Sequence, residues 1–366
     1  MLKSGIKELI QQKIIKNMNQ IQDRLPHAAG KDGIFDDTKP SWWTSGFWPG
    51  ILWTLYDWTG EDGYKSKAEK CNQKLEQYFL HHPNEFDHDV GFQFLLSSVY
   101  RFELTGDEES KRLGLMAANF LAGRFNPQGN FIKSWDRAPG WVIVDCLMNL
   151  SLLFWASRVS EDPRFKHIAI RHADTFLQHG VRGDGSTCHI LSFDADTGEF
   201  IEALGGQGFA PDSSWSRGNA WAIYGFSNMY RYTGDHKYLD AAKKIAHQFI
   251  TSLPDDDVPY WDHRVECLGL EPRDSSAAAI AASGLMEIAD HVPANEKRIY
   301  LAAANKILQS LSENYATWNI PEHQGILLHG TGNKPKGNFI DVSLIYGDYF
   351  FIEAIAKLDG RNRHIF

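Results

Sequence analysis

The chain alternates between two kinds of helix-forming segment. The first kind is apolar on nearly every side, as in Gly140–Ala156, whose only ionisable side chains are those of Asp145 and Cys146. Its leucine and phenylalanine side chains recur at helical spacing, which predicts a buried helix that begins near Asp145. The second kind is amphipathic, with its apolar side chains along one face: Tyr64–Leu80, Glu109–Phe125, Pro163–Gln178, Lys237–Ser252 and Glu296–Glu313.

A short turn motif joins the two kinds of segment. Its four copies place a Gly, or in one case a Glu, before acidic or polar residues: Trp58–Asp62, Leu104–Glu108, Val159–Pro163 and Tyr232–His236. Glycine readily ends a helix in the left-handed conformation, and an acidic residue after it caps the next helix. The repeat therefore predicts helical hairpins, each with an apolar inner helix and an amphipathic outer one.

Two looser copies complete the set. A fifth hairpin begins at Asp274, and a sixth inner helix begins near Tyr346, with the N-terminal segment Leu2–Arg24 as its outer partner. Because the first and last helices match, we expect a closed ring in preference to an open solenoid. We predict an all-α fold, an (α/α)6 barrel of six helical hairpins forming one catalytic domain over residues 1–366. Its inner helices are expected to begin near Ser45, Asp89, Asp145, Arg217, Ser275 and Asp348.

The long segments between hairpins all lead into the starts of inner helices, so we expect them at one end of the barrel: Lys31–Ser45, Asn126–Gly140, Val181–Ser214, Pro254–Pro272 and Asn319–Asp341. Loops on a rigid scaffold commonly carry function. Within them, His189–Phe193 and Phe200–Leu204 predict a small β-hairpin. The intervening Asp194–Gly198 resembles a calcium loop only faintly, because its glycine is misplaced.

Composition narrows the class of protein. The net charge of −9 argues against a nucleic-acid partner, and no basic stripe suits an anionic membrane. The N-terminus lacks the apolar core of a signal peptide, and no apolar run is long enough to span a bilayer. The four cysteines are scattered, which indicates free thiols in a reducing compartment. We expect a soluble, cytoplasmic protein, a monomer or a weak homodimer, with no membrane partner.

Two carboxylates are expected at the mouth of the barrel, where Asp89 and Asp145 begin adjacent inner helices. Paired carboxylates are typical of glycoside chemistry, with one proton donor and one group that orients or stabilises. The alternative is that each aspartate only caps its helix. His88, between two aspartates, suggests a metal only weakly.

A second group of candidates follows at the fourth inner helix. Arg217 and Trp221 lie four residues apart on one face, and Trp215 precedes them. The guanidinium suits a planar carboxylate, and the tryptophans suit the flat faces of sugars. A cation–π pair inside the barrel wall explains the same residues equally well.

Five motifs in this order resemble the unsaturated glucuronyl hydrolases of glycoside hydrolase family 88: His88–Phe92, Val144–Leu150, Asp212–Trp221, Pro272–Leu285 and Tyr346–Ala354. The resemblance implies a six-hairpin barrel without metal or cofactor, with Asp145 as general acid/base and Asp89 as the second essential carboxylate. It further implies eight substrate-binding residues: Trp43, His88, Trp135, His189, Gln207, Trp215, Arg217 and Trp221. The segment His329–Lys336 departs from the Ser and Lys pattern of members that favour sulphated substrates, which leaves sulphate preference open.

The implied reaction is hydration of the enol ether in a 4,5-unsaturated uronic acid at the non-reducing end of a lyase product, such as a chondroitin or hyaluronan disaccharide. A single carboxyl that gives a proton to carbon and takes one from water suffices for it. Three alternatives stay open: an unsaturated rhamnogalacturonyl hydrolase, a sugar 2-epimerase that uses His189 and His263, and a sugar-binding barrel without catalysis.

Overall fold

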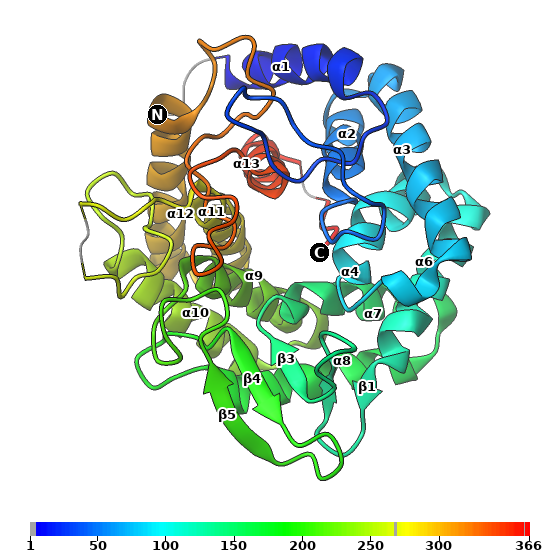
Figure 1. The fold of residues 1–366 in the computed structure, drawn as a ribbon, viewed down its shortest axis with the longest axis vertical. Helices are drawn as coiled ribbons and strands as arrows, with labels where there is room; N and C mark the ends of the chain where they lie inside the picture. The colour runs from blue at the N-terminus through cyan, green and yellow to red at the C-terminus, as the bar shows by residue number, and fades with distance from the viewer. Residues whose placement is uncertain (1–4, 267–268, 362) are drawn as a thin grey trace.

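A computed structural model describes residues 5–266, 269–361 and 363–366. Its helices form two concentric layers (Figure 1). The inner layer consists of α2 (Phe47–Thr59), the run α4 (Val90–Phe94), η2 (Leu95–Val99) and α5 (Tyr100–Thr105), then α7 (Cys146–Ser160), α9 (Ser216–Thr233), α11 (Ser275–His291) and α13 (Ile345–Leu358). The outer layer consists of α1 (Ile6–Ile21), α3 (Asp62–His81), α6 (Glu108–Gly123), α8 (Pro163–Gly180), α10 (His236–Thr251) and α12 (Ala294–Ser310).

The inner helices close into a ring. Each packs against the next along the chain, and α13 packs against α2, so the last inner helix meets the first. The predicted (α/α)6 barrel is therefore confirmed, and the open solenoid is wrong. All inner helices begin within three residues of the expected positions. As predicted, α1 takes the outer-layer position beside α13 (Figure 1), and Lys7 of α1 pairs with Asp359 at the end of α13; Leu2–Ser4 lie outside the described residues.

The hairpin turns follow the predicted chemistry. Gly60, Gly106 and Gly234 end inner helices at φ values of 75°, 70° and 69°. The side chains of Asp107 and Asp235 then accept hydrogen bonds from backbone N–H groups in the first turn of the outer helix. Glu161 occupies the glycine position of the third hairpin at φ 59°, where a side chain is strained.

Adjacent inner helices approach closely at glycines. A Cβ added to Gly91 of α4 would lie 2.4 Å from Asn149 Oδ1, and one added to Gly225 of α9 would lie 2.5 Å from Leu147 Cβ. Both contacts are made to α7, which is held on its two sides without room for another methyl group. The same kind of close contact recurs around the ring at Gly50, Gly284 and Gly347.

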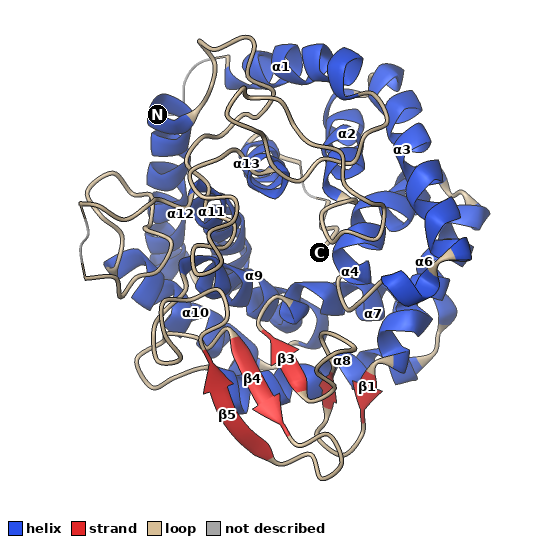
Figure 2. Ribbon diagram, viewed as in Figure 1, coloured by secondary structure: helices blue, strands red, loops and turns tan. Residues whose placement is uncertain are grey.

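Two small sheets lie at the mouth end beside α8 and α10 (Figure 2). The predicted hairpin is confirmed as β4 (Ile190–Phe193) and β5 (Phe200–Leu204), with Asp194 binding the N–H groups of its own turn. The sequence did not predict β3 (Trp141–Ile143), which pairs with β4, or the pair β1 (Phe125–Asn126) and β2 (Phe131–Ile132). Short 3-10 and π-helical turns complete the elements: η1 (Pro83–Glu85) and η3 (Leu311–Tyr315).

Among the described residues, no helix has both the length and the apolar character that crossing a bilayer requires. Cys71, Cys146 and Cys188 are buried free thiols, and Cys267 lies outside the described residues. The final segment enters the interior of the inner ring, where Phe366 is fully buried against Phe92 and Phe350.

The strained turn at Glu161 yields a prediction. Replacing Glu161 with Gly removes the Cβ penalty of the left-handed conformation, so the free energy of unfolding should rise by about 1 kcal/mol. Urea unfolding of the purified variant measures this change. Glu161→Ala is the matched control, because it removes the carboxylate but keeps the Cβ, and it should give little stabilisation. Equal gains for both variants would show that charge, and not backbone strain, is responsible.

Candidate active site

Asp145 stands where β3 passes into α7. In the antiparallel pairing of β3 with β4, Ile143 faces Ile190, and the Val144 N–H donates to the His189 carbonyl at 3.0 Å. This pairing brings His189 to Asp145, with Nε2 at 3.7 Å from Oδ2. The small sheet therefore determines which imidazole faces the carboxyl group.

Asp89 stands at the neighbouring inner helix, directly before α4. Its Oδ1 accepts a hydrogen bond from Asn149 Nδ2 on α7 at 3.1 Å and lies 3.4 Å from His88 Nε2. Neither Asp89 nor Asp145 makes a side-chain capping bond to its own helix. The cap-only interpretation is thus wrong for both, and both carboxylates are directed to other contacts.

The two carboxyl groups share an unusual electrostatic environment. Burial, then the nearby Asp89 carboxylate, raises the pKa of Asp145 to about 7, against the opposing effect of His88 and Arg217. Burial, then Asp87, raises the pKa of Asp89 well above its ordinary range, and the Asn149 hydrogen bond acts in the opposite direction. A carboxyl group whose pKa is raised in this way can both give and take a proton near neutral pH.

The tautomer of His189 follows from its hydrogen bonds. The Gln207 N–H donates to Nδ1 at 2.8 Å, so the lone pair of the ring lies on that nitrogen and the hydrogen lies on Nε2, facing Asp145. Burial, then Arg217, lowers the pKa of His189 to about 3, which keeps the ring neutral. His189 thus presents its Nε2–H toward Asp145, although the 3.7 Å separation is too long for a hydrogen bond, and the lone pair on Nδ1 is occupied by the Gln207 N–H.

His88 has the opposite tautomer. Its Nδ1 lies 3.0 Å from the Ser134 carbonyl oxygen, which can only accept, so the hydrogen is on Nδ1 and Nε2 presents a lone pair to Asp89. The ligand atoms of Asp87, His88 and Asp89 lie within 4.8 Å of one another, as a cation site would need. Asp87 Oδ1, however, already accepts the Asp89 N–H at 2.9 Å, which makes the trio a hydrogen-bonded turn.

Arg217 is buried, and its guanidinium donates hydrogen bonds to four acceptors within the protein. It donates to Asp274 Oδ2 and the Thr331 carbonyl at 2.6 Å, to the Gly332 carbonyl at 2.5 Å and to Gln207 Oε1 at 3.0 Å. It also lies over the rings of Trp215 and Tyr346, so the cation–π partner is not Trp221 as the spacing suggested. A role in binding substrate stays a prediction, and the contacts themselves anchor the segment Thr331–Gly332 to the mouth.

The predicted tryptophans occupy different depths. Trp215 lies with its ring centroid 4.4 Å from that of His189, beside Asp145. Trp43 and Trp135 are half-buried at the mouth, and Trp135 meets His88 edge-on at 6.2 Å. Trp221 is fully buried and packs on Phe92 and Phe350, in the wall behind these residues.

Sequence reasoning missed four residues of this region. His27 packs against Trp43 and Phe339, and Tyr346 lies under Arg217. Asp274 caps α11 through Ser276 N–H and pairs with Arg217. Asn149 could have been found, since it follows Asp145 by one helical turn on the same face. His27 carries no comparable signal, because only the folded chain brings it to the mouth.

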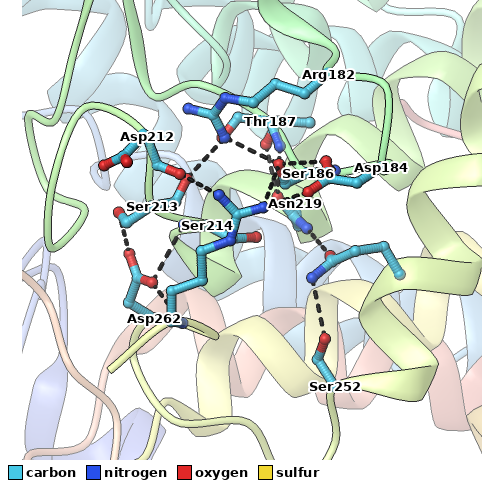
Figure 3. Close-up of polar contacts among 12 residues, drawn as sticks. Arg182, Asp184, Ser186, Thr187, Asp212, Ser213, Ser214, Asn219, Ser252 and Asp262 are labelled. Carbon is cyan, nitrogen blue, oxygen red and sulfur yellow. Dashed lines mark hydrogen bonds and ion pairs between the residues drawn. The ribbon is translucent and has the colours of Figure 1, made fainter. Parts of the chain in front are cut away.

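A polar network behind the site joins three loops (Figure 3). Asp262, fully buried, accepts hydrogen bonds from the Phe209 and Ser214 N–H groups and from the Ser213 hydroxyl. Arg182 binds the carbonyls of Ser213 and Pro211, which joins the loop before β4 to the same segment. This network fixes the turn that presents Gln207 to His189.

Comparison with known proteins identifies the family to which the sequence is similar. The model of Glycosyl Hydrolase Family 88 matches residues 10–341. An unsaturated glucuronyl hydrolase of Bacillus sp. (strain GL1) is 34% identical over 351 residues, covering 94% of this chain and 93% of that protein. An unsaturated chondroitin disaccharide hydrolase of Streptococcus pyogenes serotype M1 is 34% identical over 352 residues, covering 93% and 87%.

Solved structures agree with the sequence relatives. The crystal structure of the Bacillus sp. GL1 enzyme, described as responsible for the degradation of glycosaminoglycan, superposes with a TM-score of 0.94 at 33% identity, covering 98% of this chain and 97% of that one. A variant of the Streptococcus agalactiae enzyme complexed with dGlcA-GalNAc6S gives a TM-score of 0.86 at 29% identity, covering 100% and 95%.

The contacts of Arg217 yield a prediction. Arg217→Lys keeps the charge but cannot serve four acceptors, so buried carbonyls lose their partners and the free energy of unfolding should fall by about 2 kcal/mol or more. Chemical denaturation measures this loss, with the exposed Arg164→Lys as a control that should change little. Unchanged stability together with a raised KM would instead identify Arg217 mainly as a ligand for substrate.

Proposed function

The chain belongs to glycosyl hydrolase family 88, and from that premise we propose that it removes a 4,5-unsaturated uronic acid from the non-reducing end of glycosaminoglycan-type oligosaccharides. It is a glycoside hydrolase of the unsaturated glucuronyl and chondroitin disaccharide hydrolase group. The names of the relatives, and the dGlcA-GalNAc6S bound to one of them, support the choice of substrate class.

One observation carries the proposed chemistry. Asp145 and Asp89 stand at the starts of neighbouring inner helices, neither caps its helix, and the pKa of Asp145 is raised to about 7. A carboxyl group with such a pKa can hold a proton at rest and still accept one later in the cycle. The Nε2–H of His189, 3.7 Å from Asp145 Oδ2, would stabilise the ionised carboxylate if the two groups closed to hydrogen-bond distance during the reaction.

The proposed reaction is hydration of a vinyl ether. Asp145 transfers its proton to C4 of the unsaturated ring, which leaves a positive, oxocarbenium-like centre at C5. Water adds at C5 and returns a proton to Asp145, while Asp89 orients the reacting groups. The resulting hemiketal opens, and the neighbouring sugar leaves. The protein is regenerated with the same number of protons as before, so no external base or cofactor enters the cycle.

The geometry disfavours the sugar 2-epimerase alternative, which needs histidines that exchange protons. Nδ1 of His189 is occupied by the Gln207 N–H and the pKa of the ring is lowered to about 3. His263 packs edge-on against Phe249, and burial lowers its pKa to about 4. Neither imidazole is a competent base near neutral pH.

The remaining alternatives are separated by one assay. Purified protein is incubated with unsaturated chondroitin, hyaluronan and rhamnogalacturonan disaccharides, and the ultraviolet absorbance of the conjugated enol ether is followed. We expect loss of absorbance, fastest with a glycosaminoglycan disaccharide. A preference for the rhamnogalacturonan product would replace the proposed substrate, and binding without loss of absorbance would indicate a sugar-binding barrel.

Substitution of the carboxylates tests their roles. Asp145→Asn keeps the shape but removes the transferable proton, so kcat should fall by roughly 10²–10⁴-fold while the substrate still binds. Asp89→Asn should also lower kcat strongly.

The pH dependence of the wild type is a further test. Its kcat, measured across the pH range, should fall as pH rises through about 7, because Asp145 then loses the proton that it donates.

The matched control for these variants is Asp348→Asn. Asp348 is another buried carboxyl group near the start of an inner helix, with its pKa raised by burial to about 7, but it binds the N–H groups of Ile326 and Leu327. The Asp348→Asn substitution should lower the free energy of unfolding, because these N–H groups lose a charged acceptor, and it should change kcat little. Near-normal kcat in Asp145→Asn would refute the proposed acid/base role.

Isotope labelling tests the bond-making step. In H₂¹⁸O, label should enter at C5 of the product derived from the unsaturated sugar, since water adds there. Mass spectrometry with fragment analysis locates the label. Label at C1 would mean ordinary glycoside hydrolysis, and Asp89 and Asp145 would then have to act as an acid and a base or nucleophile at that carbon.

A further inference from the structure

Asn149 makes two hydrogen bonds of opposite polarity between α7 and the start of α4. Its Oδ1 accepts the Phe92 N–H at 2.7 Å, and its Nδ2 donates to Asp89 Oδ1 at 3.1 Å. The side chain is fully buried, and both bonds cross from one inner helix to the next. A carboxamide can accept and donate at once, whereas a carboxylate can only accept.

The first of these bonds does what an N-cap side chain normally does. The first N–H groups of a helix have no partner within it, and the residue in the cap position usually binds the N–H two or three residues later. At α4 the cap position is held by Asp89, yet the Phe92 N–H is bound by Asn149 instead. Asp89 is therefore free of the capping contact that its position in the sequence predicts.

The second bond fixes the freed carboxylate. Asn149 follows Asp145 by four residues on α7, so one face of one helix carries Asp145 and the group that holds Asp89. Gly91 allows this approach, because an added Cβ would lie 2.4 Å from Asn149 Oδ1. The relative placement of the two carboxylates thus depends on a single turn of α7.

We propose that Asn149 is a positioning residue that takes over the capping of α4 from Asp89 and holds the Asp89 carboxylate in register with Asp145. The inference rests on the proposed function only in assigning a reaction to the pair. Its alternative is a purely structural role, in which Asn149 merely joins two helices.

Asn149→Asp separates the two roles, because it keeps an acceptor for the Phe92 N–H but removes the donor to Asp89. We expect kcat to fall by roughly 10–100-fold with a smaller change in KM, since a misplaced reacting group lowers the rate of the bound complex. The pKa of Asp89 should rise, because a stabilising donor is replaced by a like charge. Asp87, His88, Arg124, Asp145 and Cys146 face the same carboxylate and are unchanged in the variant.

A double-mutant cycle makes the test specific. In an Asp89→Asn background, Asn149→Asp should cause little further loss of kcat, because the carboxylate it positions is absent. Asn228→Asp is the matched control: it adds a carboxylate at another buried asparagine of an inner helix, beside Arg231, and should leave kcat and the pH profile unchanged. If Asn149→Asp fails to fold, Asn149→Ala, which adds no charge and removes the donor to Asp89, takes its place in the cycle, where the lost bond to the Phe92 N–H is common to both backgrounds.

Two outcomes would overturn the inference. One is a lowered unfolding midpoint with wild-type kcat and pH profile, which a structural role predicts. The other is an equal loss of kcat with and without Asp89. Carbon-13 NMR titration of Asp89 keeps this test apart from the proposed function. If the wild type hydrates no unsaturated disaccharide, the function fails, and the pKa of Asp89 in Asn149→Asp still decides whether Asn149 holds it.

Discussion

The structure depends on one constraint: all six inner helices of the described chain begin at the same end of the barrel. A helix N-terminus carries unpaired N–H groups and a partial positive charge, so six of them together need acceptors. The aspartates at the mouth supply such acceptors, but each binds a different partner. Asp274 caps its own helix and pairs with Arg217, and Asp348 binds a neighbouring loop. Asp89 and Asp145 neither cap their own helices nor bind a neighbouring loop.

The same constraint explains why the fold was readable from the sequence. A turn that needs a left-handed residue and an acidic cap leaves a local signature, and a helix buried on every side leaves another. Both were visible in Leu104–Glu108 and Gly140–Ala156, and the hairpins and inner-helix starts followed from them. The strand β3 was not visible, because its three residues belong to an apolar run that reads equally well as the approach to α7.

The sequence predicted which residues belong to the site better than it predicted the contacts that these residues make. Asp89 and Asp145 emerged from their position at helix starts, but their hydrogen-bond partners depend on side chains from distant segments. Arg217 shows the difference. Its residue type suggested a clamp for an anion, whereas the folded chain surrounds it with acceptors that no local pattern reveals. The tautomers of His88 and His189 are likewise set by backbone groups far away in sequence.

The glycine contacts around the inner ring have a consequence for how such a barrel can diversify. Where Gly91 and Gly225 press against α7, a single added methyl group has no space, so these helices cannot shift to suit a new ligand. The segments between hairpins also contain tight glycine contacts, as at Gly206, where an added Cβ would lie 2.0 Å from His189 Nδ1, but these occur at single turns and not between whole helices. Selection for a different sugar would thus act on the loops at the rim, while the carboxylates beneath them keep one arrangement. The reaction can therefore stay the same while the preferred substrate changes, because the carboxylates lie on the inner helices and the substrate-selecting residues would lie on the loops.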